Sequence, residues 1–489
     1  MRNERRADRS TSDIPHRSVV KFAVVTLGCD KNTVDSERYR AALLDHGAEE
    51  VRDAALAELV VVNTCGFIDA AKRESIDAIV QAARLKTGGA ARAVVAVGCL
   101  VERHKAELAE ALPEVDLLLG ASETEQLVPR LRERGLLGAP VSAHPGVRAY
   151  AGDTPHVRYL KVSEGCDHGC AFCAIPLMRG RHRSFALEEI VREAQLLELQ
   201  GACEVNLVAQ DLAHYGRDLP GGARLPELLE ALVRETTIPW IRNLYLYSAG
   251  ITPRLLEVIA REPRIVRYLD MPIQHASDAV LERMRRPERR HTIRETVARF
   301  RDAVPALAIR TTCIVGFPGE TDEDFARLLD FLEEMRFERV GAFTYSAQEG
   351  THAARLADDV PEGVKRERLE RLTGRQRAIT EERYETRVGE RVRALVERAA
   401  GAAGAAGAAV GDGRGATARL PWQADDIDGV TRLDADAPAG SFVEVEVTGV
   451  VDDYDFEARV LGVVAPRRAP TPLPRSRHLP LAAAGSFGR

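Results

Sequence analysis

The sequence predicts an α/β protein built from three parts: a doubly wound parallel-sheet domain, a partial (β/α)6 barrel of the TIM type, and a small antiparallel β-barrel near the C-terminal end. Two series of short β-branched runs alternate with segments of helical periodicity, the first from Lys21 to about Arg134 and the second over residues 154–384. From Glu385 the pattern changes to short stretches of alternating apolar and polar residues, which is typical of antiparallel strands.

Size and composition set the broad class. A chain of 489 residues exceeds what one hydrophobic core usually supports, and 45% hydrophobic residues suffice to fill two or three. The net charge of -6 supplies no overall positive field for nucleic acid. No apolar run approaches the roughly 18 residues of a membrane span, and the start MRNERRADRSTSDIPHR lacks a secretory apolar core, so we expect a cytoplasmic protein without a membrane partner. Eight cysteines are too sparse for a disulfide scaffold, which favours metal binding or chemistry.

The first part is expected to span residues 19–137, after a disordered stretch at 1–18. Its strands and helices are expected to alternate as FAVVTLGC, SERYRAALLDHG, ELVVVNTCGF, KRESIDAIVQAARL, AVVAVGCL, HKAELAEAL, VDLLLG and ETEQLVPRLRE. Cys29, Cys65 and Cys99 each stand where one of the first three strands ends. Because sites in such sheets lie at the carboxyl ends of strands, three loops should carry one thiol each toward a common edge.

The second part, expected over residues 154–384, follows a linker at 138–153 that contains Gly and Pro. Its six expected strands are VRYLKVSEGC, EVNLVAQD, WIRNLYLYS, RYLDMPIQ, AIRTTCIVGF and RVGAFTYS, with helical segments between them. A full eight-stranded barrel typically needs about 250 residues, so these units predict a partial barrel whose active face is formed by the strand carboxyl ends.

The third part is expected over residues 385–464. The stretch SFVEVEVTGVVDDYDFEARVLGVV predicts strands of a small barrel. The Ala/Gly-rich segment AAGAAGAAGAAVGDGRGA interrupts it and is interpreted as an extended loop. The tail at 465–489 is expected to be disordered.

Three cysteines in the second part are closely spaced. The stretch SEGCDHGCAFCAIPLMRGRHRSF places Cys166, Cys170 and Cys173 in a Cys-x3-Cys-x2-Cys motif. Structural zinc uses four ligands in separated pairs, so this spacing is too tight for it. A 4Fe-4S cluster has four iron corners, and three thiolates would leave one iron open to a substrate or cofactor. Gly165 and Gly169 would let the chain wrap round such a cluster at positive φ. The alternative is three buried or zinc-bound cysteines.

This motif, directly after the first strand of a six-strand β/α series, resembles that of the radical S-adenosylmethionine (SAM) superfamily. The segments TLGCDKN, VNTCGF and VGCL, with the motif and the terminal barrel, resemble the methylthiotransferase family over residues 20–464. The resemblance implies that Cys166, Cys170 and Cys173 hold a 4Fe-4S cluster whose open iron binds SAM. It also implies that the terminal barrel is a TRAM domain, which is OB-like.

The resemblance implies a second, auxiliary 4Fe-4S cluster, involved in sulfur delivery, on Cys29, Cys65 and Cys99. The alternative is that these are unrelated small cysteines, since free cysteine is often buried. Cys203 and Cys313 lie within strand runs and are expected to pack in the core.

Three further segments bear on the branch of the family. LGCDKNTVDSE, AIPLMRGRHRSF and LDMPIQHASDAVLERMRRP resemble the RimO branch, which adds a methylthio group to the β-carbon of an aspartate in small-subunit ribosomal protein S-twelve. This implies two partners, that ribosomal protein on or near the ribosomal subunit and an electron donor such as flavodoxin or ferredoxin, with nucleic acid met only as part of the ribosome. The chain departs from the family's usual Pro at Asp30 and from its usual Arg at Phe185.

The alternative is the tRNA branch, which methylthiolates N6-isopentenyladenosine or threonylcarbamoyladenosine. That branch usually has Gln-Met-Asn after its first cysteine, and Gln-Ser-Gly-Ser-Asp where this chain has QHASD at 274–278. Residues 391–460 carry 13 Asp and Glu against seven Arg and no Lys, a net charge of -6. An acidic barrel would repel tRNA and attract a basic ribosomal protein, although an acidic face kept for solubility is the alternative. The predicted docking surface consists of Asp452, Asp453, Tyr454, Asp455, Phe456 and Glu457.

Other residues are expected near the cofactor, and no acid–base catalyst is assigned. By the resemblance, Gln210 and Asp211 face SAM or the substrate, unless they only cap the following turn. Gly316 begins GFPGET, which the resemblance implies is a wall of the SAM site, with a bare turn as the alternative. Arg179 is expected to bind a carboxylate of SAM or of the substrate by forked hydrogen bonds, with a solvated face as the alternative. His275 is expected either to relay a proton or to be a structural histidine.

Overall fold

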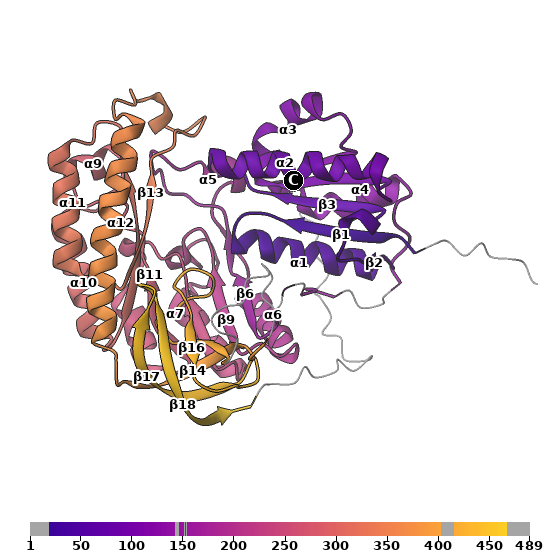
Figure 1. Ribbon diagram of the computed structural model, residues 1–489. Coiled ribbons are helices and arrows are strands. Elements are labelled where there is room, and N and C mark those ends of the chain that lie inside the picture. The colour runs from indigo at the N-terminus through magenta and orange to yellow at the C-terminus, as the bar shows by residue number, and fades with distance from the viewer. Residues whose placement is uncertain (1–18, 142–145, 151, 153, 402–414, 467–489) are drawn as a thin grey trace, which may run out of the picture.

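The computed structural model of the protein describes residues 19–141, 146–150, 152, 154–401 and 415–466. The N-terminal sheet with its helices lies beside an open barrel, and a small closed barrel lies against one end of that barrel (Figure 1). The predicted disordered stretch at 1–18, residues 467–489 of the disordered tail predicted at 465–489, and the greater part of the Ala/Gly-rich segment lie outside the described residues. Ala465 is the last residue of a strand, so the predicted tail started too early.

The N-terminal part is a five-stranded parallel sheet of order β2-β1-β3-β4-β5. Its elements are β1 Lys21–Thr26, α1 Asp30–Asp45, β2 Glu49–Glu50, β3 Leu59–Thr64, α2 Asp69–Gly88, β4 Ala93–Gly98, α3 Cys99–Ala111, β5 Leu117–Gly120 and α4 Leu127–Glu133. Side chains alternate across the strands, so Phe22 and Val61 pack with α1 and α4 while Ala23 and Val60 pack with α2 and α3. Helices therefore cover both faces, and the predicted doubly wound sheet is confirmed.

The second part is an open six-stranded parallel sheet in which strands pair in sequence order, from β6 at one edge to β13 at the other. Its strands are β6 Val157–Lys161, β9 Glu204–Val208, β10 Trp240–Asn243, β11 Ile265–Asp270, β12 Ala308–Val315 and β13 Arg339–Thr344. Its helices are α5 Ile175–Arg179, α6 Leu187–Leu199, α7 Leu225–Glu235, α8 Pro253–Arg261, α9 Asp278–Arg283, α10 Arg290–Ala303, α11 Asp322–Met335 and α12 Glu362–Glu385. The sheet does not close on itself, which confirms the predicted partial barrel.

A short antiparallel ribbon interrupts the first β/α unit. It pairs β7 Ser163–Glu164 with β8 Arg183–Ser184, and the Cys-x3-Cys-x2-Cys motif lies in the loop between them. The ribbon closes this loop at its base, so the motif lies just beyond the carboxyl end of β6.

The C-terminal part is a closed barrel of order β14-β15-β16-β18-β17. Its strands are β14 Arg391–Arg398, β15 Thr417–Arg419, β16 Thr431–Leu433, β17 Phe442–Val451 and β18 Asp455–Ala465. The prediction of an antiparallel barrel needs one correction, because β16 pairs with β18 in parallel. The segments that precede these two strands enter the barrel from the same end, which sequence alternation cannot reveal.

The closed barrel packs against the amino ends of the open barrel's strands. Trp240, which begins β10, shares one apolar core with barrel residues such as Phe442. Glu204, which begins β9 and is fully buried, pairs with Arg242 at 2.7 Å and with Arg419 of the closed barrel. The carboxyl ends of the six strands consequently stay free for a site. Among the helices that the structure describes, none is both long and apolar enough to cross a membrane.

Candidate active site

The loop that carries the Cys-x3-Cys-x2-Cys motif has a fixed backbone. Gly165 turns the chain at φ +74°, and a Cβ there would overlap the carbonyl group of Arg181, so only glycine fits. The Ala171 amide donates to the carbonyl of Met284 at 2.9 Å, which anchors the middle of the loop. Gly169 does not adopt positive φ, so that part of the glycine prediction is wrong.

The thiols of Cys166, Cys170 and Cys173 are half-buried and lie near enough to one another to interact electrostatically. Burial raises the pKa of Cys166 to about 11 and that of Cys173 to about 12, and the neighbouring thiols act in the same direction. Zinc–sulfur bonds of about 2.3 Å would bring all ligand atoms within about 4 Å of one another. Among the described residues, no cysteine trio has its three sulfurs within 4.8 Å. The spacing therefore does not suit a single ion bound by all three thiolates.

The other three predicted cysteines also meet at one edge. Cys29 precedes α1, Cys65 follows β3 and Cys99 begins α3, so all three lie at carboxyl ends of neighbouring strands. A Cβ on Gly28 would lie 2.7 Å from Cβ and 3.0 Å from Sγ of Cys65, which shows how closely these loops approach. Burial raises the pKa of Cys99 to about 11, with Cys29 and Cys65 near enough to raise it further. Cys203 and Cys313 are buried in the core, as predicted.

The two trios are connected by α5, the helix that follows the Cys-x3-Cys-x2-Cys motif. Cys99 packs in a small apolar cluster with Ala174 and Met178. Arg179, the last residue of α5, donates from Nε to Cys99 Sγ at 3.1 Å. Its Nη1 donates to Asp35 Oδ2 at 2.8 Å. One helix therefore contacts the second trio directly.

The remaining contacts of Arg179 revise its predicted role. Nη2 donates to Asn32 Oδ1 at 2.5 Å, and Nη1 also contacts Glu164 at 3.3 Å. A guanidinium has five N–H donors in a fixed fork, and this chain engages four of them. The pair needed for forked binding of a carboxylate is not free, so the expected contact with SAM or substrate does not fit the structure.

Sequence reasoning missed the buried charges around this arginine. Lys161, at the end of β6, contacts Asp35 of α1 at 2.5 Å and Glu164 at 2.6 Å. Lys161 and Arg179 hold the pKa of Asp35 well below its usual range, despite burial. The sequence did contain a signal for this cluster, because Asn32 and Asp35 lie one turn apart on a helix that starts beside Cys29, and residues at i and i+3 share a face.

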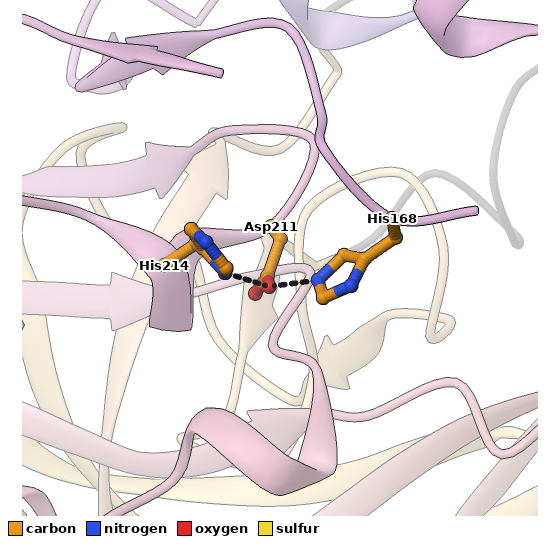
Figure 2. Close-up of side chains that lie close together, drawn as sticks. All are labelled: His168, Asp211 and His214. Atoms are coloured by element: carbon orange, nitrogen blue, oxygen red, sulfur yellow. Dashed lines mark hydrogen bonds and ion pairs between the residues drawn. The ribbon is translucent and has the colours of Figure 1, made fainter. Parts of the chain in front are cut away.

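Asp211 acts as a hub (Figure 2). Its Oδ1 accepts hydrogen bonds from the backbone amides of Ala213 at 3.0 Å and Tyr247 at 3.1 Å. Its Oδ2 lies 2.7 Å from His168 Nε2 and 3.5 Å from His214 Nδ1. These interactions hold the pKa of Asp211 well below its usual range, although burial opposes them.

Among the described residues, His168, Asp211 and His214 form a group of possible metal ligands, since one ligand atom from each lies within 4.8 Å of the others. A carboxylate offers about four lone-pair positions, and protein donors already face them all, so the geometry is explained without an ion. Asp211 caps the following turn, which was the alternative considered for it, and also fixes His168 inside the cysteine loop. The His168 ring stacks on Tyr247, with ring centroids 4.1 Å apart.

Gln210 differs from its neighbour. Its Nε2 donates to Glu164 at 2.9 Å, while its Oε1 is buried without a protein partner. Next to this region, a cavity of about 290 Å³ is lined by Asp167, His168, Cys170, Asp211, Tyr247 and Arg285, among others. The buried Oε1 of Gln210 therefore has an unused hydrogen-bond acceptor position among the described residues.

Gly316 opens the loop that follows β12. It has φ +71°, its amide donates to Glu320 at 2.7 Å, and a Cβ there would overlap the side chain of Lys365. Burial raises the pKa of Glu320 to about 7, although Arg368 opposes the shift. His275 Nδ1 accepts from the Ser277 amide at 2.9 Å, and burial lowers its pKa to about 3. A neutral, buried histidine favours the structural alternative for His275.

Two further residues near the cysteine loop escaped prediction. The Arg286 guanidinium lies 3.9 Å from Cys170 Sγ and 4.1 Å from the ring centroid of Tyr247. Glu288 accepts from Tyr247 Oη at 3.1 Å and from Arg286 at 3.1 Å. Arg286 lies at the end of the LDMPIQHASDAVLERMRRP segment and Glu288 directly follows it, but only the fold brings them back to the motif.

The predicted docking surface on the closed barrel needs correction. Phe456 is fully buried in the barrel core, and Tyr454 lies under Arg339 with 3.7 Å to the ring centroid. Arg432 pairs with Asp452 at 2.6 Å and with Asp455 at 3.3 Å. These carboxylates are therefore partly neutralised by the chain itself.

Known protein families match the first two parts of the chain separately. The family described as "Uncharacterized protein family UPF0004" matches residues 21–120, and the radical SAM superfamily matches residues 160–332. The protein named "Ribosomal protein uS12 methylthiotransferase RimO" from Anaeromyxobacter sp. (strain K) is 46% identical over 92% of this chain and 95% of its own length. The chain belongs to the RimO family of radical SAM methylthiotransferases. Proteins of the same name from Myxococcus xanthus and Geobacter sulfurreducens are 42% and 40% identical, covering 92% and 90% of this chain and 95% and 98% of their own lengths.

Membership of this family makes the protein an enzyme that uses SAM and 4Fe-4S clusters. A solved structure of the radical SAM methyltransferase TsrM from Kitasatospora setae has a TM-score of 0.51 at 16% identity, covering 66% of this chain and 73% of that one. This likeness shows the fold.

Proposed function

We propose that this enzyme adds a methylthio group to the β-carbon of an aspartate in ribosomal protein S-twelve, which its relatives' names call uS12. The observation that carries the proposal is the meeting of two cysteine trios, since Arg179 beside one trio donates to Cys99 of the other at 3.1 Å. A transferase that must deliver sulfur to a carbon needs both functions close together.

We assign one cluster to each trio. The proposed ligands of the radical cluster are Cys166, Cys170 and Cys173, and those of the auxiliary cluster are Cys29, Cys65 and Cys99. Within each trio the thiols interact electrostatically yet are not close enough to share one ion, which supports both assignments. When bound, the reduced radical cluster and SAM supply a radical able to take hydrogen from an unactivated C–H bond.

The chain's own groups hold this machinery in place. The Asp211 carboxylate orients His168, and Tyr247 packs on the His168 ring, so the cysteine loop is rigid around the proposed cluster. The buried, unpartnered Oε1 of Gln210 fits a donor such as the amino group of SAM. Gly316 lies at the carboxyl end of β12, and its missing side chain leaves room for the side chain of Lys365.

The partners are proposed on chemical grounds. An acidic C-terminal barrel is complementary to a basic ribosomal protein, met on or near the ribosomal subunit. Reduction of the radical cluster requires a low-potential electron donor, such as flavodoxin or ferredoxin. Both partners place the enzyme in the cytoplasm.

Two substitutions separate the proposed clusters. In Cys170→Ala, reductive cleavage of SAM is expected to be lost, because the radical cluster loses one of three ligands. In Cys65→Ala, cleavage is expected to persist while methylthio transfer to uS12 stops. Both products can be quantified by liquid chromatography with mass spectrometry. Normal methylthiolation by Cys65→Ala would sink the auxiliary assignment.

Substrate identity is tested in cells. Mass spectrometry of small-subunit proteins from a strain lacking the gene should show loss of the methylthio mass increment on one aspartyl peptide of uS12. The gene restored in trans should return the increment, and the Cys65→Ala gene should not. An unchanged uS12, with loss of methylthio groups from tRNA instead, would refute the proposal in favour of the tRNA branch.

A further inference from the structure

We propose that Arg179 is a positioning residue for the auxiliary site: it fixes the Cys99 sulfur and raises the reduction potential of the cluster held there. The inference rests on the proposed assignment of the auxiliary cluster to Cys29, Cys65 and Cys99. It differs from the role that the sequence predicted for this arginine, which was recognition of a carboxylate on SAM or the substrate.

Arg179 contacts the proposed auxiliary site directly. Arg179 lies six residues after Cys173, yet its Nε reaches Cys99 Sγ at 3.1 Å in the N-terminal part. The Arg179 side chain is only 4% exposed, so water does not compete for this donor. Ala174, Ile175 and Met178 of the same segment pack with Cys99, which fixes the approach of the helix.

The guanidinium is held independently of the sulfur. Its other donors bind Asp35 at 2.8 Å, Asn32 at 2.5 Å and Glu164 at 3.3 Å. Lys161 contacts both Asp35 and Glu164, so two cations and two carboxylates balance in a buried cluster. A planar fork fixed at both ends cannot rotate away, and its Nε–H remains aimed at Cys99.

This contact has an electrostatic consequence. A hydrogen bond and a positive charge at a ligating sulfur stabilise the added electron, because both offset negative charge on the cluster. Low local dielectric strengthens this effect. Arg179 therefore favours reduction of the auxiliary cluster, and it does so from the helix that continues the radical-cluster loop.

The test uses full-length protein in which Cys166, Cys170 and Cys173 are all replaced by Ala, so that only the auxiliary cluster remains. After anaerobic reconstitution, this parent should hold about four irons per chain. Its midpoint potential is measured by redox titration followed by electron paramagnetic resonance. Arg179→Met should shift the potential downward. Arg181→Met is the matched control, because Arg181 lies in the same loop with its side chain 92% exposed, and it should leave the potential unchanged.

Arg179→Lys covers the case in which Arg179→Met binds little iron. Lysine keeps the charge but cannot donate from the Nε position, so its potential should lie between those of the parent and Arg179→Met. A parent-like potential in the iron-loaded Arg179 variants would overturn the proposal. The proposal would also be overturned if Arg179→Lys left the auxiliary potential unshifted and, with the three cysteines restored, weakened SAM binding. That combination is the result expected if Arg179 recognises a carboxylate. A parent without iron would instead refute the auxiliary assignment, and the proposal with it.

Discussion

Replacement of Gly28 by Ala should disable the auxiliary site and leave the radical site intact. Gly28 has φ +89°, and an added Cβ would lie 2.7 Å from Cβ and 3.0 Å from Sγ of Cys65. The left-handed backbone costs an L-residue about 1–2 kcal/mol. Crowding the rigid Cys65 loop adds about 1–3 kcal/mol, or displaces the thiol if the loop yields. We therefore expect a total loss of about 2–5 kcal/mol in the free energy of unfolding of the N-terminal part.

Gly389→Ala is the matched control. Gly389 has nearly the same φ, +87°, but a Cβ there would meet nothing within 4 Å. It should lose only the backbone contribution of about 1–2 kcal/mol and keep both clusters. The assays are urea unfolding, iron content after anaerobic reconstitution and reductive SAM cleavage. Gly28→Ala should fall from about eight to about four irons per chain with cleavage retained. Equal iron content in the two variants would refute the reasoning.

Three further predictions concern other parts of the molecule. Gly165→Ala should abolish SAM cleavage and remove the radical cluster's irons, because its Cβ would overlap the backbone that closes the cysteine loop. Gly180→Ala is the control: Gly180 has φ +70° with open space around it, so this variant should keep both SAM cleavage and the irons. Equal behaviour of the two variants would contradict this explanation of the loop. Glu204→Ala should lower the free energy of unfolding by about 3–5 kcal/mol, because the buried guanidinium of Arg242 loses its carboxylate partner while Arg419 keeps Glu397. The exposed pairs of Glu230 predict about 1 kcal/mol or less for Glu230→Ala, and comparable urea midpoints would count against the buried network. Burial raises the pKa of Asp425 to about 7, so this carboxyl binds more protons in the folded than in the unfolded state between pH 4 and 7, and its contribution to stability falls as pH rises through that window. Asp425→Asn should therefore gain stability relative to the unsubstituted protein from pH 5 to pH 8, by at most about 4 kcal/mol. A difference in urea unfolding that does not depend on pH would disprove the shift.

The sequence by itself determined the elements and the positions of the cysteines along them. Continuous apolar runs such as LVVVNT and AVVAVG, separated by a helical segment, are expected to be buried parallel strands, because both faces of such a strand must be covered. Strands that run parallel end at one edge, so the convergence of Cys29, Cys65 and Cys99 follows from their positions after those runs. The local spacing of Cys166, Cys170 and Cys173 likewise limits what they can bind.

Only the tertiary structure decided how the three parts meet. Side chains far apart in sequence, such as Arg179 and Cys99 or Asp35 and Lys161, come into contact because α5 packs against α3 and α1 packs against β6, which no local pattern encodes. The same holds for Phe456, whose place in an alternating strand gave no sign of which face would be covered. Periodicity reports the environment of a residue along its own element, whereas the partner of a buried charge depends on which element packs against it.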